Sequence, residues 1–120
     1  MPLTTSVLYD DGVALVALAG ELDLATRPPF DAAVDGVLAD GLRSVLIDLD
    51  ALDFCDSTGL GALLRASRVV TAAGGSCVVA AARGPVHKLL TLTNLGAALQ
   101  LDPEVQPALH RLRQQRSSTA

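Results

Sequence analysis

The sequence has few aromatic residues, little cysteine and no concentrated positive charge, and each scarcity excludes something. Aromatic residues make up 2% of the chain, with one tyrosine, two phenylalanines and no tryptophan, so the core must be aliphatic. The formal net charge is −4, and the basic residues are scattered until the last ten positions. Nucleic-acid binding needs a concentrated basic face. We therefore expect no nucleic-acid partner.

Long apolar segments are also missing. The longest apolar run, Val13 to Ala19, is far shorter than the roughly 20 residues that a membrane helix needs. The N-terminus has neither the basic start nor the apolar stretch of a signal peptide. The sequence thus predicts a cytoplasmic protein with no membrane association.

The residues that commonly bind metals do not cluster. Zinc sites use ligand pairs at short spacing, and Cys55, Cys77, His87 and His110 show no such spacing. We expect no metal and no cofactor. In the cytoplasm the two cysteines are expected to be buried thiols.

What is abundant is hydrophobic residues, which form 50% of a chain whose 120 residues suit one compact domain. Alternating and helical apolar periods, separated by glycine and proline, predict strands and helices in the order β-β-α-β-α-β-α-β-α. The first two strands flank a turn at Asp10-Asp11-Gly12. The predicted helices are 26–41, 57–73, 84–95 and 103–115, and the later strands are 44–52, 76–82 and 97–101. Strands that alternate with helices predict an α/β fold with a largely parallel sheet. Such a sheet places Cys55 and Cys77 at opposite ends, so no disulfide should join them.

The stretch LDFCDSTGLG, residues 52–61, is the most unusual part of the chain. It leads from a buried strand into a helix, where Asp56 or Ser57 can serve as the N-cap. Capping alone does not explain Gly59 and Gly61, because each glycine weakens a helix by about 1 kcal/mol relative to alanine. The two glycines indicate that something approaches the backbone closely.

The motif does not fit the common catalytic serine or phosphate-binding patterns. A nucleophile elbow reads G-x-S-x-G, but Cys55 occupies the position of the first glycine. Both histidines fall on predicted helices, and the only lysine, Lys88, does not follow a glycine-rich loop. The acidic run from Asp48 to Asp56 is interpreted as a solvated strand end. We therefore expect no enzymatic activity.

Ser57 fits better as the substrate of another enzyme. It lies at the exposed start of a predicted helix, beside glycines and without a general base. A phosphate at that position would meet free N–H groups at the positive end of the helix dipole. The fold should tolerate it, and the added charge would act on the surface.

Three segments carry a family resemblance: GELDLAT at 20–26, VLIDLDALDFCDSTGLGALL at 45–64 and VHKLLTLTNL at 86–95. They resemble the STAS domain of bacterial anti-sigma factor antagonists. The resemblance implies a STAS-like single domain, with an N-terminal β-hairpin leading into a mostly parallel sheet packed with about four helices. We expect this domain to span residues 1–116, with 117–120 as a disordered tail.

The resemblance also implies a mechanism. In that family an anti-sigma factor with serine kinase activity phosphorylates the serine after the aspartate, which is Ser57 here, and a serine phosphatase reverses the modification. The unphosphorylated protein binds the anti-sigma factor and so frees a sigma factor for transcription. By position, the residues implied in partner binding are Asp23, Asp56, Thr58, Gly59, Leu60 and Gly61. The alternative is a STAS docking module, never phosphorylated, in a transporter-associated or sensory complex.

Overall fold

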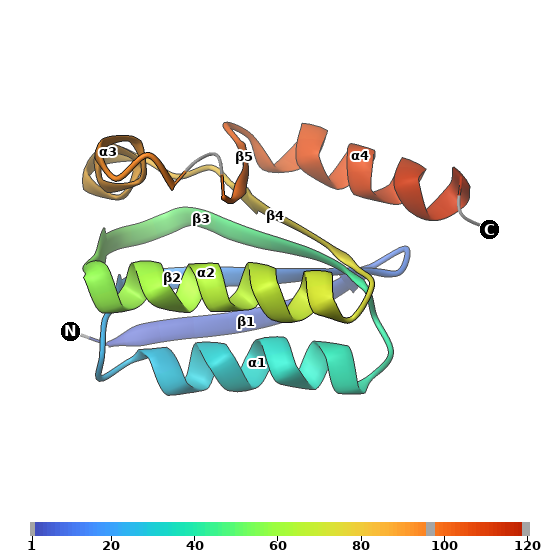
Figure 1. The fold of residues 1–120 in the computed structure, drawn as a ribbon, viewed down its shortest axis with the longest axis horizontal. Coiled ribbons are helices and arrows are strands. Elements are labelled where there is room, and N and C mark those ends of the chain that lie inside the picture. Colours follow the sequence, from blue (N-terminus) through green and yellow to red (C-terminus); the bar gives the residue numbers. More distant parts are fainter. Residues whose placement is uncertain (1, 96–97, 119–120) are drawn as a thin grey trace.

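The computed structural model describes residues 2–95 and 98–118, which form a five-stranded sheet with helices on both faces (Figure 1). The strands are β1 (Leu3–Asp10), β2 (Val13–Leu22), β3 (Ser44–Cys55), β4 (Ser76–Ala80) and β5 (Gln100–Asp102). The helices are α1 (Arg27–Ala39), α2 (Ser57–Ala72), α3 (Gly84–Leu92) and α4 (Val105–Ser118). The predicted order of elements is confirmed. None of the described helices has the length and apolar character needed to cross a bilayer.

The sheet follows the chain, with the strand order β1-β2-β3-β4-β5. Only the β1–β2 pair is antiparallel, and the other three pairs are parallel. Asp11 and Gly12 both have positive φ at the hairpin turn, as Asp-Gly in a type I′ turn requires. The α/β class and the largely parallel sheet agree with the sequence prediction.

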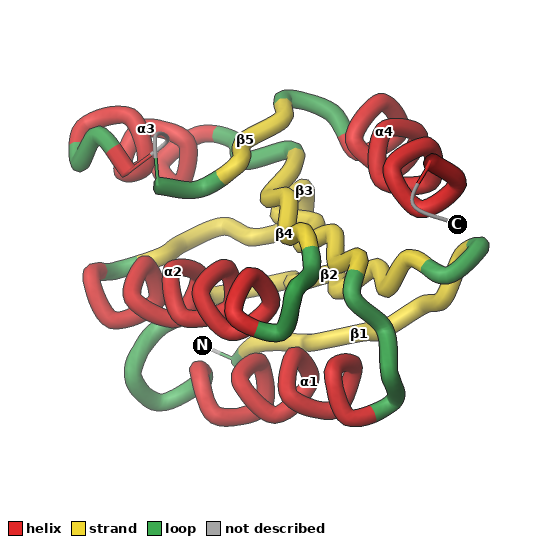
Figure 2. The backbone as a smooth tube through the Cα atoms, turned by 45° about the vertical axis from the view of Figure 1, so that its right-hand side comes forward, coloured by secondary structure: helices red, strands yellow, loops and turns green. Residues whose placement is uncertain are grey.

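Two aliphatic cores lie on the two faces of the sheet. The larger core joins α1, α2 and α3 to the sheet and includes Phe30, Leu63 and Leu90. The smaller core packs Leu109 and Leu112 of α4 against Leu46 and Val78. Figure 2 shows α1 and α2 side by side below the sheet and α4 on the other face. The segment that contains Ser57 therefore belongs to the larger core alone.

The strand β3 extends well beyond its neighbour β4. Asp48 pairs with Ala80, the last residue of β4, whereas β3 continues to Cys55 beside β2 alone. This overhang carries the acidic residues that the sequence prediction placed at a solvated strand end, and Asp50 and Asp53 are indeed exposed. The overhang brings α2 to begin at one end of the long axis of the molecule, and α4 ends at the other (Figure 1).

Several predicted boundaries differ from the structure. The predicted strand 44–52 continues to Cys55, because β2 is long enough to pair with it. The predicted edge strand 97–101 is shorter, Gln100–Asp102, and residues 96 and 97 lie outside the described residues. The helix α4 continues through Ser118, past the predicted end of the domain at 116. Of the predicted tail, residues 119 and 120 lie outside the described part of the chain.

Candidate functional site

The junction of β3 and α2 settles which residue caps the helix. Asp56 is the N-cap, in an extended conformation, and its Oδ1 accepts a hydrogen bond of 2.8 Å from the backbone N–H of Gly59. Ser57 is therefore the first helical residue. Its side chain is exposed and forms no hydrogen bond within the described residues. A helix that is capped by Asp56 leaves the Ser57 hydroxyl available to another molecule.

The two glycines that follow have different surroundings. Gly59 is buried, and a Cβ there would lie 2.2 Å from the carbonyl oxygen of Leu22. Gly61 is half-buried, and its nearest neighbour would be Arg27 Nη1 at 3.8 Å, an ordinary contact. Gly59 is thus required by the packing of α2 on β2 within the molecule. Of the two, only Gly61 presents backbone to an outside partner.

Leu60 faces the interior as well. It is 6% exposed and belongs to the larger core. Together with Gly59, it packs beneath the exposed residues of the site and keeps α2 in place. The part of the predicted partner-binding set that reaches the surface is Asp23, Asp56, Thr58 and Gly61, all of which are half-buried.

Asp23 is fixed at the site by a turn between β2 and α1. Its Oδ1 accepts a 3.0 Å hydrogen bond from the N–H of Thr26, and Thr26 Oγ1 accepts one of 2.9 Å from the N–H of Asp23. Thr26 precedes α1, but its hydroxyl donates to the carbonyl of Glu21 and does not cap the helix. These hydrogen bonds tie the two ends of the Asp23 loop together.

The Asp23 loop and the Ser57 junction are also tied to one another. Leu22 pairs with Cys55 at the ends of β2 and β3, and the N–H of Asp56 donates to the carbonyl of Leu22 at 3.4 Å. Asp23, which follows Leu22 directly, therefore lies beside the helix start that carries Ser57.

Sequence reasoning missed two exposed apolar side chains at this end of the sheet. Leu24, in the Asp23 loop, is 71% exposed, and Phe54, near the end of β3, is 44% exposed. The available signal was a large apolar residue, leucine, in the loop between β2 and α1. Exposed apolar patches are common in protein–protein contact surfaces.

Neither cysteine contributes a reactive thiol to this site. Both are free, as predicted. Burial, together with the charge of neighbouring Asp56, raises the pKa of Cys55 to about 12, and burial raises the pKa of Cys77 to about 12. Among the described residues, no group of three or more His, Cys, Asp or Glu side chains is arranged to hold a metal ion. His87 and His110 are exposed on α3 and α4.

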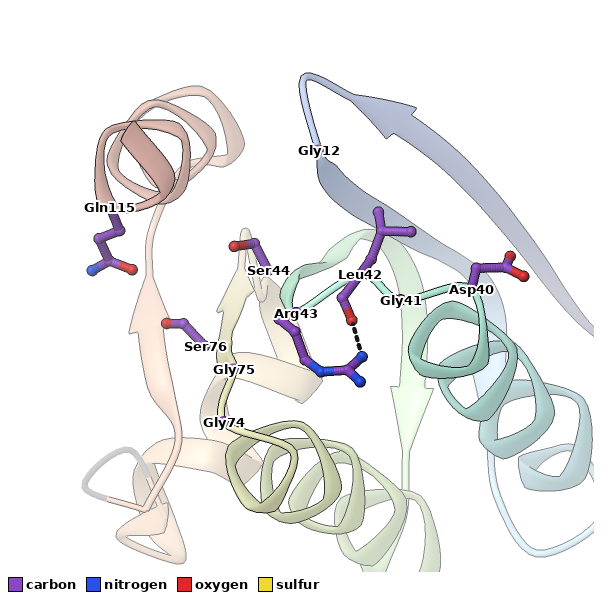
Figure 3. A pocket seen from close by; sticks show the side chains of 10 residues that line it. All are labelled: Gly12, Asp40, Gly41, Leu42, Arg43, Ser44, Gly74, Gly75, Ser76 and Gln115. Atoms are coloured by element: carbon purple, nitrogen blue, oxygen red, sulfur yellow. Dashed lines mark hydrogen bonds between the residues drawn. The ribbon is translucent and has the colours of Figure 1, made fainter. Parts of the chain in front are cut away.

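Two surface hollows lie apart from Ser57. One, of about 570 Å³, lies at the start of β3 and β4, and Figure 3 shows it between the hairpin turn, the end of α1 and α4. Among the described residues that line it, the one cationic side chain is Arg43, which donates 2.8 Å and 3.0 Å hydrogen bonds to the carbonyls of Leu42 and Leu38. A second, of about 480 Å³, lies between α3 and β5. Neither hollow includes Ser57 among its described lining residues.

Comparison with known proteins gives a consistent family match. The model of the STAS domain matches residues 6–108. The anti-sigma-F factor antagonist RsfB of Mycobacterium tuberculosis is 34% identical over 88 residues, which cover 71% of this chain and 72% of that protein. The anti-sigma F factor antagonist of Paenibacillus polymyxa is 31% identical, over 79% and 82% of the two chains. A crystal structure of an anti-sigma factor antagonist from Mycobacterium paratuberculosis superposes with a TM-score of 0.82 at 35% identity, covering 92% of this chain and 94% of that one.

Proposed function

The chain belongs to the STAS domain family, and from that premise we propose that it is an anti-sigma factor antagonist switched by phosphorylation of Ser57. In this proposal the unphosphorylated protein binds an anti-sigma factor in the cytoplasm and so releases a sigma factor. Phosphorylation ends that binding, and a serine phosphatase restores it. The protein itself catalyses nothing.

The observation that supports the proposal is that the helix cap and the exposed hydroxyl are different residues, Asp56 and Ser57. Asp56 caps α2, and the Ser57 hydroxyl is exposed without a hydrogen bond within the described residues. A kinase can therefore modify Ser57 without removing an interaction that holds the helix.

The proposed modification is a phosphoryl transfer from ATP. The Ser57 Oγ attacks the γ-phosphorus, the bond to the bridging oxygen of ADP breaks, and a base of the kinase takes the hydroxyl proton. The product adds a charge of about −1.5 to −2. At the first position of α2, that charge is favoured by the helix dipole. The folded domain should therefore tolerate the phosphate.

The partner surface that we propose combines the exposed members of the site. Ser57 lies at its centre, with Asp23 and Thr58 beside it and Gly61 one turn along α2. Leu24 adds an exposed apolar side chain. Gly59 and Leu60 act on partner binding indirectly, because they set how closely α2 packs against β2.

Loss of binding on phosphorylation follows from desolvation. A partner that packs against the neutral Ser57 hydroxyl would have to bury the phosphate without an opposite charge. Burying an unpaired charge in an interface is strongly unfavourable.

The test begins with a pull-down from the native host to identify the anti-sigma factor. Titration calorimetry then compares wild type, Ser57→Ala and Ser57→Asp, with phosphosite mapping after incubation with the partner and ATP. We expect one phosphate at Ser57, near-wild-type affinity for Ser57→Ala and much weaker binding for Ser57→Asp. Thr58→Ala is the matched control and should slow phosphorylation without blocking it.

Two outcomes would contradict the proposal. One is equal affinity of all three proteins for the partner, and the other is phosphate mapped only at residues other than Ser57. Either result would favour a STAS docking module without a phosphorylation switch.

A further inference from the structure

Arg27 is placed beside the face of α2 that begins with Ser57. It is the first residue of α1, and α1 and α2 lie side by side with their first turns at the same end of the molecule (Figures 1 and 2). Its Nη1 lies 3.8 Å from the position that a Cβ of Gly61 would take. The guanidinium therefore lies against α2 at the level of Gly61, one helical turn beyond Ser57.

Ser57 and Gly61 are four residues apart, so they lie on one face of α2, separated by about 6 Å along its axis. Since Gly61 has no side chain, only backbone covers the surface of α2 between the two positions, and Arg27 lies next to that surface. The Ser57 side chain leans toward the start of α2. Arg27, whose side chain is long and flexible, would reach a phosphate on Ser57 Oγ by turning about one helical turn toward the start of α2.

We propose that Arg27 binds the phosphate of phosphorylated Ser57. The proposal rests on the function proposed above, namely that Ser57 is phosphorylated. It adds a residue of this chain that receives the phosphate. A guanidinium presents two parallel N–H donors, which match the oxygens of a phosphate.

Arg27 can leave its present partner at little cost. Its Nε donates to Asp31 Oδ2 at 3.0 Å, and both side chains are about a quarter exposed. The other carboxylate oxygen, Asp31 Oδ1, is buried without a hydrogen bond, 3.6 Å from Arg65 Nη1, which is also buried without one. A movement of a few tenths of an ångström would join these two atoms. Asp31 would then keep a cationic partner after Arg27 turns to the phosphate.

The inference changes how phosphorylation would end partner binding. Drawn to the phosphate, the side chain of Arg27 would lie along α2 between Ser57 and Gly61, the glycine whose backbone is open to a partner. Phosphorylation would then cover part of the partner surface as well as charge it. An aspartate at position 57 is shorter and carries less charge than phosphoserine, so Ser57→Asp should hold Arg27 less well and weaken partner binding less.

The test uses the full chain with phosphoserine incorporated at position 57 by amber suppression, so that no kinase is needed. Phosphorus NMR follows the second pKa of the phosphate in wild type, Arg27→Gln, Arg27→Lys and Arg68→Gln. An adjacent cation favours the dianion, so wild type should have the lowest value, with Arg27→Gln higher by at least about 0.5 unit. Arg27→Lys should fall between them, because it keeps the charge and loses the two-pronged geometry.

Arg68→Gln is the matched control. Arg68 is exposed on the same face of α2, eleven residues and about 16 Å beyond Ser57. It removes the same charge without removing the proposed contact, so its value should equal that of wild type. The helix dipole is common to all four proteins and cancels in the comparison.

Equal values for wild type and Arg27→Gln would overturn the inference, as would an equal rise in Arg68→Gln. Circular dichroism tests whether each variant is folded. If Arg27→Gln is not folded, Arg27→Lys is compared with wild type in its place. A kinase that fails to modify Ser57 would contradict the proposed function and leave this measurement unchanged. The two proposals can therefore fail separately.

Discussion

The carbonyl oxygen of Leu22, at the end of β2, packs directly against the Cα of Gly59 in the first turn of α2. A Cβ at position 59 would lie 2.2 Å from that oxygen and 2.8 Å from the sulfur of Cys55. Backbone atoms cannot move aside as a flexible side chain can. The contact between the Asp23 loop and the Ser57 junction therefore depends on a glycine at position 59.

The two glycines of the motif should respond in opposite directions to alanine. Gly59→Ala should lower the free energy of unfolding by about 1–3 kcal/mol, because it overpacks a buried contact. Gly61→Ala should raise it by up to about 1 kcal/mol, because the helix gains propensity and nothing obstructs the methyl group. Urea denaturation of both variants measures this. Equal destabilisation by the two substitutions would show that a side chain at position 61 also meets close neighbours.

Capping should depend on Asp56 and not on Ser57. Asp56→Ala removes the 2.8 Å hydrogen bond to Gly59 and should cost about 0.5–2 kcal/mol of stability. Ser57→Ala removes an exposed hydroxyl and should change stability by less than about 0.5 kcal/mol. Thermal and chemical denaturation compare the two. A loss in Ser57→Ala as large as that in Asp56→Ala would make the serine structural and weaken the switch.

Leu24 should contribute to partner binding without contributing to the fold. Leu24→Asp should weaken binding to the anti-sigma factor at least about tenfold, as expected when a polar charge replaces an apolar contact residue. Leu8→Asp is the control, because Leu8 is similarly exposed, 65% against 71%, but lies near the hairpin turn at the other end of β2. Calorimetry that shows equal loss in both variants would refute a local role for Leu24.

Both thiols should be unreactive in the folded protein. With the pKa of each near 12, about one thiol in ten thousand is ionised at pH 8. A disulfide-forming reagent should therefore react slowly until urea unfolds the chain, and then with both cysteines. Burial raises each pKa above its unfolded value of 9.0, so the free energy of unfolding should fall as the pH rises from about 9 toward about 12. Fast labelling of the native protein would contradict the buried placement.

The order of the elements could be predicted because glycine and proline mark nearly every boundary. The choice between Asp56 and Ser57 as the cap could not, since both residue types cap helices well and only the backbone geometry decides. The same limit applied to Gly59 and Gly61. Their sequence contexts are alike, but one meets the carbonyl of Leu22 and the other meets open surface.

Features that depend on contacts between neighbouring elements could not be predicted from the sequence. The extension of β3 to Cys55 depends on the length of β2, which pairs with it past the end of β4. The contact between Arg27 and Gly61 could not be predicted, because it joins two helices and no local sequence pattern indicates such a contact. The exposure of Leu24 could not be predicted, because a single leucine in a loop forms no periodic pattern.

The separation of the two ends of the molecule has a practical consequence for attaching labels. The helix α4 ends at the far end of the long axis from the start of α2, whereas Pro2 lies at the same end as Ser57, packed beside Gly20 (Figure 1). A fluorophore or a surface tether joined after α4 should leave the proposed partner surface free. The same group placed before Pro2 would stand next to it and compete with the partner for space.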